Sequence, residues 1–388
     1  MGCIDELPVL VLFRIFEFCA SFLDCVKCVS PSFWHLSEKV LRLYCAHYGS
    51  QVLFVTLFRS ALHSTQRLTL LDVQSNMQCL KIVWQHMMQR DISDSALLVN
   101  CSNLYVIGGC HHSNDHVQHS NDHVQFSSNS SFNAEVCDLR THDCQKLSNL
   151  KHSRRRCAVA MDKNGVIYCF GGHAGGYFSE NPLSKCIEVY EHQSWRTLEV
   201  QLPFAIWHCQ TVTIENEIYI FGLCMRAENL FPANFLYEPV FLCFNTKDHK
   251  FRTVRQMKKR RPWCAICRVF EKIYAIAGSD LFCKSAEVYD MYLDRWTDLP
   301  DLCCDVQALG VSVKNGAFAM PLMTNASTLE LYVFHQSGFI QIFNWRSFAW
   351  RVHDKRLHFS IAPKPHIYGQ TNVLQNAVAC NITSSCAS

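Results

Sequence analysis

Five short apolar segments of this chain end in the same way, and they constrain its fold more than any other feature. Each has a tyrosine between apolar neighbours, and four of the five run into a glycine, as in Ile167-Tyr168-Cys169-Phe170-Gly171-Gly172. The tyrosines lie 51 to 63 residues apart, at Tyr105, Tyr168, Tyr219, Tyr274 and Tyr332. A recurring strand with a period near 50 residues indicates a repeat architecture.

A second pairing follows each of these strands. An acidic or amide residue after a bulky side chain starts a turn, and a second bulky side chain follows at a fixed distance. The spacing is seven residues in four units and five in the other: Cys137–Cys144, Tyr190–Trp195, Phe244–Phe251, Tyr289–Trp296 and Phe343–Trp350. We expect each pair to face one another across two antiparallel strands, where aromatic pairs stabilise by about 0.2–1 kcal/mol.

Each unit therefore has four strands. The first is an apolar strand such as residues 157–161, and the tyrosine strand and the two paired strands follow. One such unit cannot bury both of its faces, but units arranged radially can. The predicted fold is mainly β, a propeller of five to six four-stranded blades.

These features resemble kelch repeats over residues 94–357, and the resemblance implies a kelch-type β-propeller. Five repeats are visible. Residues 358–388 form either a polar tail or part of a degenerate sixth blade, for which Val373 to Ile382 is the candidate.

One insertion interrupts the first repeat. Residues 112–118 are repeated immediately as residues 119–125, just after the first pair of glycines. Its polar composition favours a structureless loop created by a tandem duplication, and its four histidines are a weaker candidate for metal binding.

Residues 1–48 have a different pattern. Leu12, Ile15, Phe16 and Cys19 follow the i, i+3, i+4, i+7 spacing of a helix, and Pro8 stands where a helix would start. With Asp5-Glu6-Leu7-Pro8 before them, they resemble an F-box, a small α-helical module that docks onto the Skp-type adaptor of a cullin–RING ubiquitin ligase. The resemblance implies adaptor contacts by Leu7, Pro8, Leu12, Ile15 and Phe16. The alternative is an ordinary helical cap on the propeller.

Residues 49–93 are predicted to be a helical connector. Residues 41–49 and 83–91 also resemble part of a BACK region, which would place the chain with BTB/BACK kelch-like cullin adaptors. No BTB domain fits in the residues before the propeller, so this remains the second interpretation.

Composition limits the function classes. The formal net charge of +3 over 388 residues is too small to indicate bulk nucleic-acid binding. No apolar run reaches the ~20 residues of a membrane helix, and no secretory signal is visible. We therefore expect no membrane association and read the 23 cysteines as reduced, mostly apolar residues, including the pairs Cys25–Cys28 and Cys264–Cys267.

No nucleotide-binding, hydrolase or zinc-protease motif is present, so we expect no enzyme activity, cofactor or metal. Two basic runs precede first strands of repeats and are the candidate substrate-binding residues: Arg154, Arg155 and Arg156, and Arg260 and Arg261. Arginine binds carboxylates with two parallel hydrogen bonds, so an acidic motif in a target protein is the expected ligand.

These features together predict a non-catalytic substrate receptor. Its expected partners are a Skp-type adaptor, a cullin and a target protein, and its expected location is the cytoplasm, with the nucleus as an alternative. The rival function is a kelch scaffold that binds cytoskeletal or other proteins.

Overall fold

The chain is mainly β, and its strands form four-stranded sheets. The computed structural model describes residues 51–59, 64–72, 81–87, 94–100, 103–120, 123–138, 141, 143–174, 184–225, 237–262, 264–269, 271–278, 284–303, 317–325, 328–335, 340–345, 347–353 and 372–380. Residues 1–48, with the predicted adaptor contacts Leu7, Pro8, Leu12, Ile15 and Phe16, lie outside this part of the chain.

Five sheets, named blades 1 to 5, correspond to the five predicted repeats. Blades 1 and 2 contain β4 (Ala96–Asn100), β5 (Asn103–Ile107), β8 (Ala134–Asp138) and β9 (Cys144–Lys146), then β10 (Ala158–Met161), β11 (Ile167–Phe170), β12 (Cys186–Glu191) and β13 (Ser194–Gln201). Blade 3 contains β14 (Ile206–Ile214), β15 (Glu217–Met225), β16 (Tyr237–Asn245) and β17 (Lys250–Arg252). Blades 4 and 5 contain β18 (Ala265–Val269), β19 (Lys272–Ile276), β20 (Ala286–Asp290) and β21 (Arg295–Leu299), then β22 (Ala317–Asn325), β23 (Thr328–His335), β24 (Ile340–Asn344) and β25 (Ala349–Val352).

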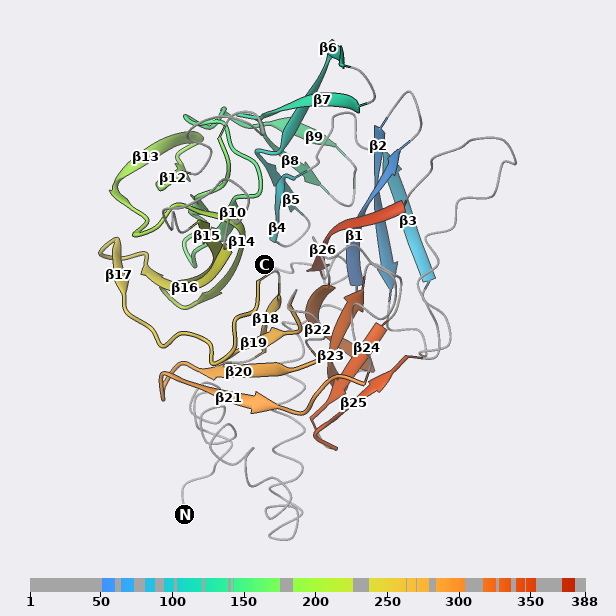
Figure 1. The fold of residues 1–388 in the computed structure, drawn as a ribbon, viewed down its shortest axis with the longest axis vertical. Helices are drawn as coiled ribbons and strands as arrows, with labels where there is room; N and C mark the ends of the chain where they lie inside the picture. The colour runs from blue at the N-terminus through green and yellow to red at the C-terminus, as the bar shows by residue number, and fades with distance from the viewer. Residues whose placement is uncertain are drawn as a thin grey trace.

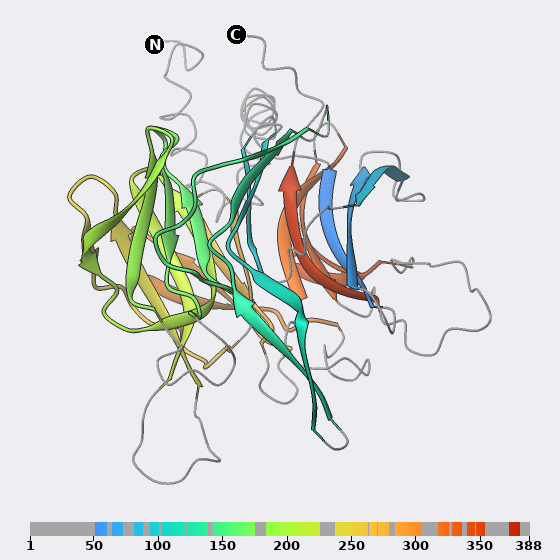
Figure 2. The same ribbon diagram turned by 90° about the horizontal axis from the view of Figure 1, so that it is seen from above.

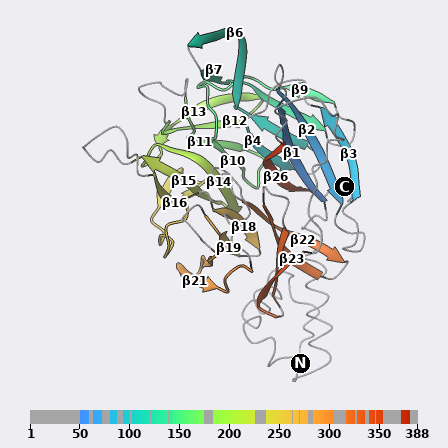
Figure 3. The same cartoon turned by 45° about the vertical axis from the view of Figure 1, so that its right-hand side comes forward.

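A further four-stranded sheet, the closing sheet, joins the two ends of the described chain. Its order is β26 (Asn372–Cys380), β1 (Gln51–Arg59), β2 (Ser64–Asp72) and β3 (Lys81–Met87). β26 is antiparallel to β1, and Gln51 faces Cys380. β26 also contacts both β4 and β22, the first strands of blades 1 and 5. The first strands of successive blades contact one another as well, so the ring of sheets is closed (Figures 1 and 3).

The closing sheet corrects the prediction for residues 49–93. The strands described in this range, β1, β2 and β3, are not a helical connector, and β3 includes residues 83–87 of the second stretch that resembled a BACK region. Of the two alternatives for the C-terminal residues, β26 agrees with the degenerate blade. Pairing these two distant segments places a sheet between blades 5 and 1, so that the sheets pack radially around the whole ring and leave only short, protected edges.

The insertion in blade 1 is also different from its prediction. It forms a two-stranded hairpin of β6 (Cys110–Ser120) and β7 (His123–Ser130), in which Ser120 faces His123. Figure 2 shows this hairpin extending away from the ring. The hairpin connects β5 to β8, and these two strands still pair directly within blade 1.

The hydrophobic core lies between the blades. One buried cluster combines Phe221 and Phe241 of blade 3 with Tyr289 and Trp296 of blade 4. The ring centroids of Phe241 and Tyr289 are 5.1 Å apart at an edge-to-face angle of 85°. Each blade thus buries its faces against its neighbours, which is why the second strand of blade 2 (β11) is buried along its whole length.

The predicted strand pairing is confirmed. In each blade the two paired residues are direct partners across the third and fourth strands: Cys137 and Cys144, Tyr190 and Trp195, Phe244 and Phe251, Tyr289 and Trp296, and Phe343 and Trp350.

Within the described residues, no helix has the length and hydropathy needed to cross a bilayer.

Candidate functional site

One end of the ring, which we name the junction face, carries the connections between successive blades. There the glycines that follow the second strands of blades 1 and 2 lie against the segments leading into blades 2 and 3. Gly109 N–H donates to Arg154 O at 2.9 Å, and Gly172 N–H donates to Ile206 O at 2.8 Å. A Cβ on Gly108 would overlap Arg154 O, and the positive φ of Gly108 (66°) also favours glycine.

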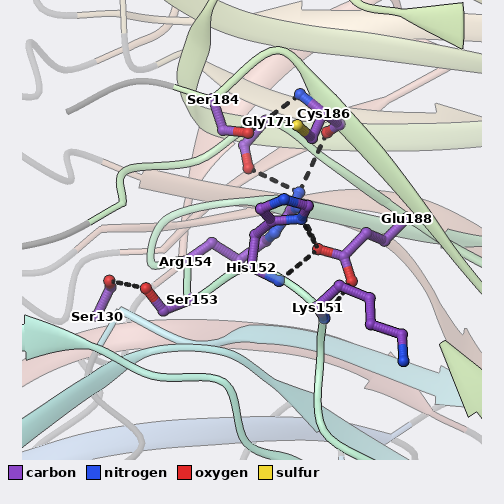
Figure 4. Close-up of polar contacts among 9 residues, drawn as sticks. All are labelled: Ser130, Lys151, His152, Ser153, Arg154, Gly171, Ser184, Cys186 and Glu188. Carbon is purple, nitrogen blue, oxygen red and sulfur yellow. Dashed lines mark hydrogen bonds and ion pairs between the residues drawn. The ribbon is translucent and has the colours of Figure 1, made fainter. Parts of the chain in front are cut away.

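The first basic run begins with a buried arginine. The side chain of Arg154 is fully buried, and its Nη2 lies 2.5 Å from Oε1 of Glu188 on β12 (Figure 4). Arg154 Nη1 donates to the carbonyl oxygens of Gly171 and Cys186, at 3.1 and 3.2 Å. The backbone N–H groups of Lys151 and His152 donate to the same carboxylate, at 2.7 and 3.1 Å. Arg154 therefore holds the segment before β10 onto the inside of blade 2.

The second basic run repeats this arrangement in blade 4. Arg261 Nε lies 3.0 Å from Oε1 of Glu287 on β20, and neither side chain is exposed. Arg261 also donates to the carbonyl oxygens of Ala277 and Ser285, at 3.0 and 2.6 Å. Lys258 and Lys259 donate their backbone N–H groups to Glu287, as Lys151 and His152 do to Glu188. We call these two arrangements the arginine clamps.

The clamps correct part of the site prediction. Arg154 and Arg261 are 0% and 1% exposed, and Arg155 is 2% exposed, so these three side chains are not surface cations on a substrate-binding rim. These side chains are enclosed within the ring, and the charges of Arg154 and Arg261 are compensated by glutamates. Removing one partner of such a buried ion pair strongly destabilises the fold. The two runs also precede blades 2 and 4 and are separated by the junction between β13 and β14, so they are not on neighbouring junctions.

Arg260 and Arg156 are the two predicted residues that reach the surface. Arg260 is exposed. Arg156 is partly exposed, and its Nε lies 2.9 Å from Oδ1 of Asp94. Its guanidinium carbon lies 5.7 Å from the centre of the Trp207 ring, and its Nη1 lies 2.7 Å from Nε2 of His208. Because arginine only donates, His208 Nε2 accepts this hydrogen bond.

Arg156 is the centre of a group that we name the mouth cluster: Asp94, Arg156, His173, Trp207 and His208. The Trp207 ring lies 4.5 Å from the His208 ring and 6.4 Å from the His173 ring, measured between centroids. Asp94 and Arg156 immediately precede the first strands of blades 1 and 2, and His208 lies in the first strand of blade 3. First strands line the centre of the ring, so the mouth cluster lies where the ring opens onto the junction face.

The backbone of the mouth cluster is strained at matching places. Asp94, Arg156 and His208 have φ values of 57°, 52° and 49°, in the left-handed region. This conformation costs a non-glycine residue about 1–2 kcal/mol. His208 adopts it in an irregularity of the pairing between β14 and β15, where the register shifts between Trp207 and Gln210. The mouth cluster brings a partly exposed cation, an indole ring and two imidazole rings together, so it is the candidate binding site.

Sequence reasoning missed four of these five residues and the clamp carboxylates. One signal was present: each clamp arginine follows a lysine by three positions and precedes a Cys-Ala pair by three, and each clamp glutamate precedes Val-Tyr. Nothing comparable marks Asp94, His173, Trp207 or His208, which come together only through the ring. Among the residues that the structure describes, no group of three or more His, Cys, Asp and Glu side chains is placed to hold a metal ion.

Comparison with protein families shows a match within blade 4. Residues 264–302, which contain all four strands of blade 4, match the Kelch motif. The predicted aromatic pair Tyr289–Trp296 and the tyrosine strand with Tyr274 both lie within this range. The Kelch motif in blade 4 and the propeller arrangement of four-stranded blades support a kelch-repeat protein.

Proposed function

We propose that this chain is the substrate-recognition subunit of a cullin–RING ubiquitin ligase, which binds a target protein at the mouth cluster. A kelch propeller is suited to protein–protein interaction, because it presents loops from several blades on one face. The mouth cluster is the observation that supports target binding by the propeller. The ligase half rests on the resemblance of residues 5–34 to an F-box.

The chemistry of the mouth cluster supports an acidic or peptide-like ligand. Arg156 is a partly exposed cation next to an indole ring, and arginine beside an aromatic residue recurs at the energetic centres of protein interfaces. A carboxylate of a target protein would compete with Asp94 for the Arg156 guanidinium. Arg260, on a separate junction, would supply long-range attraction for an acidic partner rather than a specific contact.

In this proposal the chain is not an enzyme. Its contribution is proximity: the N-terminal residues hold the ligase, the propeller holds the target, and the effective concentration of a target lysine near the ubiquitin carrier rises. The complex would act in the cytoplasm or the nucleus.

Affinity purification tests both halves. The tagged full-length chain is compared with a version lacking residues 1–48 and with the double variant Pro8→Ala/Ile15→Asp, and captured proteins are identified by mass spectrometry. We expect a Skp-type adaptor and a cullin with the full chain only, and target proteins with all three. Capture of a BTB-type cullin would favour the kelch-like alternative, and targets without any cullin would favour a kelch scaffold.

A further inference from the structure

Blade 1 differs from the other blades at its outer turn. In blades 2 to 5 the partners across the third and fourth strands are aromatic, with ring centroids 5.0 to 5.3 Å apart: Tyr190–Trp195, Phe244–Phe251, Tyr289–Trp296 and Phe343–Trp350. In blade 1 the corresponding partners are Cys137 and Cys144, which form a disulfide. The expectation that all cysteines are reduced is therefore wrong for this pair.

The disulfide is open to reagents from one side. Cys144 lies on β9, the outermost strand of blade 1, and all three residues of that strand are exposed. Cys137 is 3% exposed and lies beneath it on β8. A small thiol in solution would therefore reach the Cys144 sulfur first.

The free thiols that the structure describes are mostly shielded from the same chemistry. Cys157, Cys169, Cys224, Cys243, Cys264 and Cys267 are buried. Burial raises the pKa of the Cys243 thiol to about 12 and raises the pKa values of Cys169, Cys209 and Cys267 as well. The thiolate is the reactive form, so these residues are poor competitors. Cys303 is an exposed free thiol and serves as an internal comparison.

We propose that Cys137 and Cys144 are a redox modification site, which exchanges with small thiols and disulfides of the glutathione class. In the closing direction, the Cys144 thiolate attacks one sulfur of a glutathione disulfide and releases one glutathione thiolate. Cys137 then attacks the Cys144 sulfur of the mixed disulfide and releases the second. Two electrons pass from the protein dithiol to the glutathione disulfide, and the two cysteine protons leave with the two glutathione molecules. Opening is the reverse reaction with two glutathione thiols.

The Cys137–Cys144 disulfide restrains the strand that leads into the junction face. β9 pairs with β8 through three residues only, and the chain after it runs directly to Lys151, His152 and Arg154 of the first clamp. When the bond is open, two small thiols face one another where every other blade has two aromatic rings. β9 then loses its strongest connection to β8, and the segment that leads into the first clamp and Arg156 is held less tightly.

Alkylation tests the exchange on the full-length wild-type chain. The protein is equilibrated in buffers of increasing ratio of reduced to oxidised glutathione, trapped with N-ethylmaleimide and digested for mass spectrometry. We expect Cys137 and Cys144 to be protected together in oxidising buffers and labelled together in reducing ones, while Cys303 is not linked to either. Independent labelling of the two residues, or labelling in every buffer, would overturn the proposal.

Hydrogen exchange and a matched variant test the consequence. Reduction should increase amide exchange in β8, β9 and the Lys151–Arg154 segment and leave blade 4 unchanged. We expect the midpoint of thermal unfolding to fall by about 2–4 °C on reduction. The variant Cys137→Tyr/Cys144→Trp copies the pair of blade 4 and should show no redox shift, whereas Cys303→Ser should shift like the wild type. A shift that persists in the aromatic variant, or unchanged exchange in β8 and β9, would contradict the mechanism. Neither experiment involves a ligase component, so its outcome is independent of the proposed function.

Discussion

Arg261 Nε and Glu287 Oε1 lie 3.0 Å apart in the interior of blade 4, and neither side chain is exposed. The same pair recurs in blade 2 as Arg154 and Glu188. In both, two backbone N–H groups of the preceding junction share the carboxylate, so one glutamate on the third strand fixes the path of the chain into its own blade. These clamps fix the junctions that lead into blades 2 and 4.

Breaking a clamp should destabilise the fold strongly. Arg261→Met leaves the Glu287 carboxylate buried without its cation, and such a loss typically costs about 3–5 kcal/mol. The neighbouring substitution Arg260→Met removes an exposed cation and should change stability by no more than about 0.5 kcal/mol. Denaturant unfolding of the two variants and the wild type measures the difference. Equal stabilities for both variants would show that the clamp does not stabilise the ring.

Substitution of two glycines distinguishes the stability cost of a steric overlap from the cost of backbone strain. Gly108 and Gly165 both have positive φ, at 66° and 81°, but a Cβ would meet Arg154 O only at Gly108 and has nothing within 4 Å at Gly165. Gly165→Ala should cost about 1–2 kcal/mol from strain alone. Gly108→Ala should cost clearly more, because it also displaces the junction that accepts from Gly109 N–H. Thermal unfolding distinguishes them, and a Gly108→Ala cost no greater than that of Gly165→Ala would contradict the contact.

The ion pair of Glu217 and Arg252 on blade 3 predicts an acid-sensitive contribution to stability. Burial by itself raises the pKa of Glu217, but hydrogen bonds from Arg252 and Tyr219 outweigh it and hold this pKa below its ordinary value. A carboxyl whose pKa is lowered on folding stabilises the fold above its unfolded pKa of about 4.3, and this stabilisation is lost as the pH falls through the folded pKa.

Arg252→Met should therefore lower the free energy of unfolding at pH 7, and its difference from the wild type should shrink below about pH 4. Because the Arg252 side chain is 40% exposed, we expect a difference of about 0.2–1 kcal/mol at neutral pH. Arg196→Met, which removes a cation 3.5 Å from Glu191 in an exposed pair, is the control and should have little effect. A difference for Arg252→Met that is constant across the pH range would exclude the ion pair as its source.

The proposed binding site predicts that substitutions of two surface arginines reduce target capture by different amounts. Arg156→Gln removes the cation of the mouth cluster while its backbone contacts, such as the N–H donated to Asp94 O at 2.7 Å, do not depend on the side chain. We expect the affinity for the target proteins, measured by their capture, to fall about thirtyfold, which corresponds to the roughly 2 kcal/mol of a residue at the energetic centre of an interface. Arg260→Gln should reduce capture less and mainly at low salt. The opposite ranking would move the site away from the mouth cluster.

Local sequence pattern predicted much of the propeller. The tyrosine strands gave the second strand of each blade, and the seven- or five-residue spacing of Tyr289–Trp296 and its counterparts gave the third and fourth strands with their register. These features are readable because strand pairs joined by a short turn are set by residues close in sequence. The two basic runs were also placed correctly, each before the first strand of a blade.

Other features depended on contacts between distant residues. β1 and β26 close the ring although they lie at opposite ends of the described chain, and neither carries the repeat pattern. The sequence predicted Arg154 and Arg261 to be surface cations. Their burial depends on a carboxylate from the third strand of the blade, which is distant in the sequence. The mouth cluster joins residues from three blades.

The sequence by itself thus determined the repeating unit, because a hairpin's register follows from its own turn. The tertiary structure decided which charges are buried, which ends pair and which side chains meet at the mouth, because these depend on how whole blades pack around the ring.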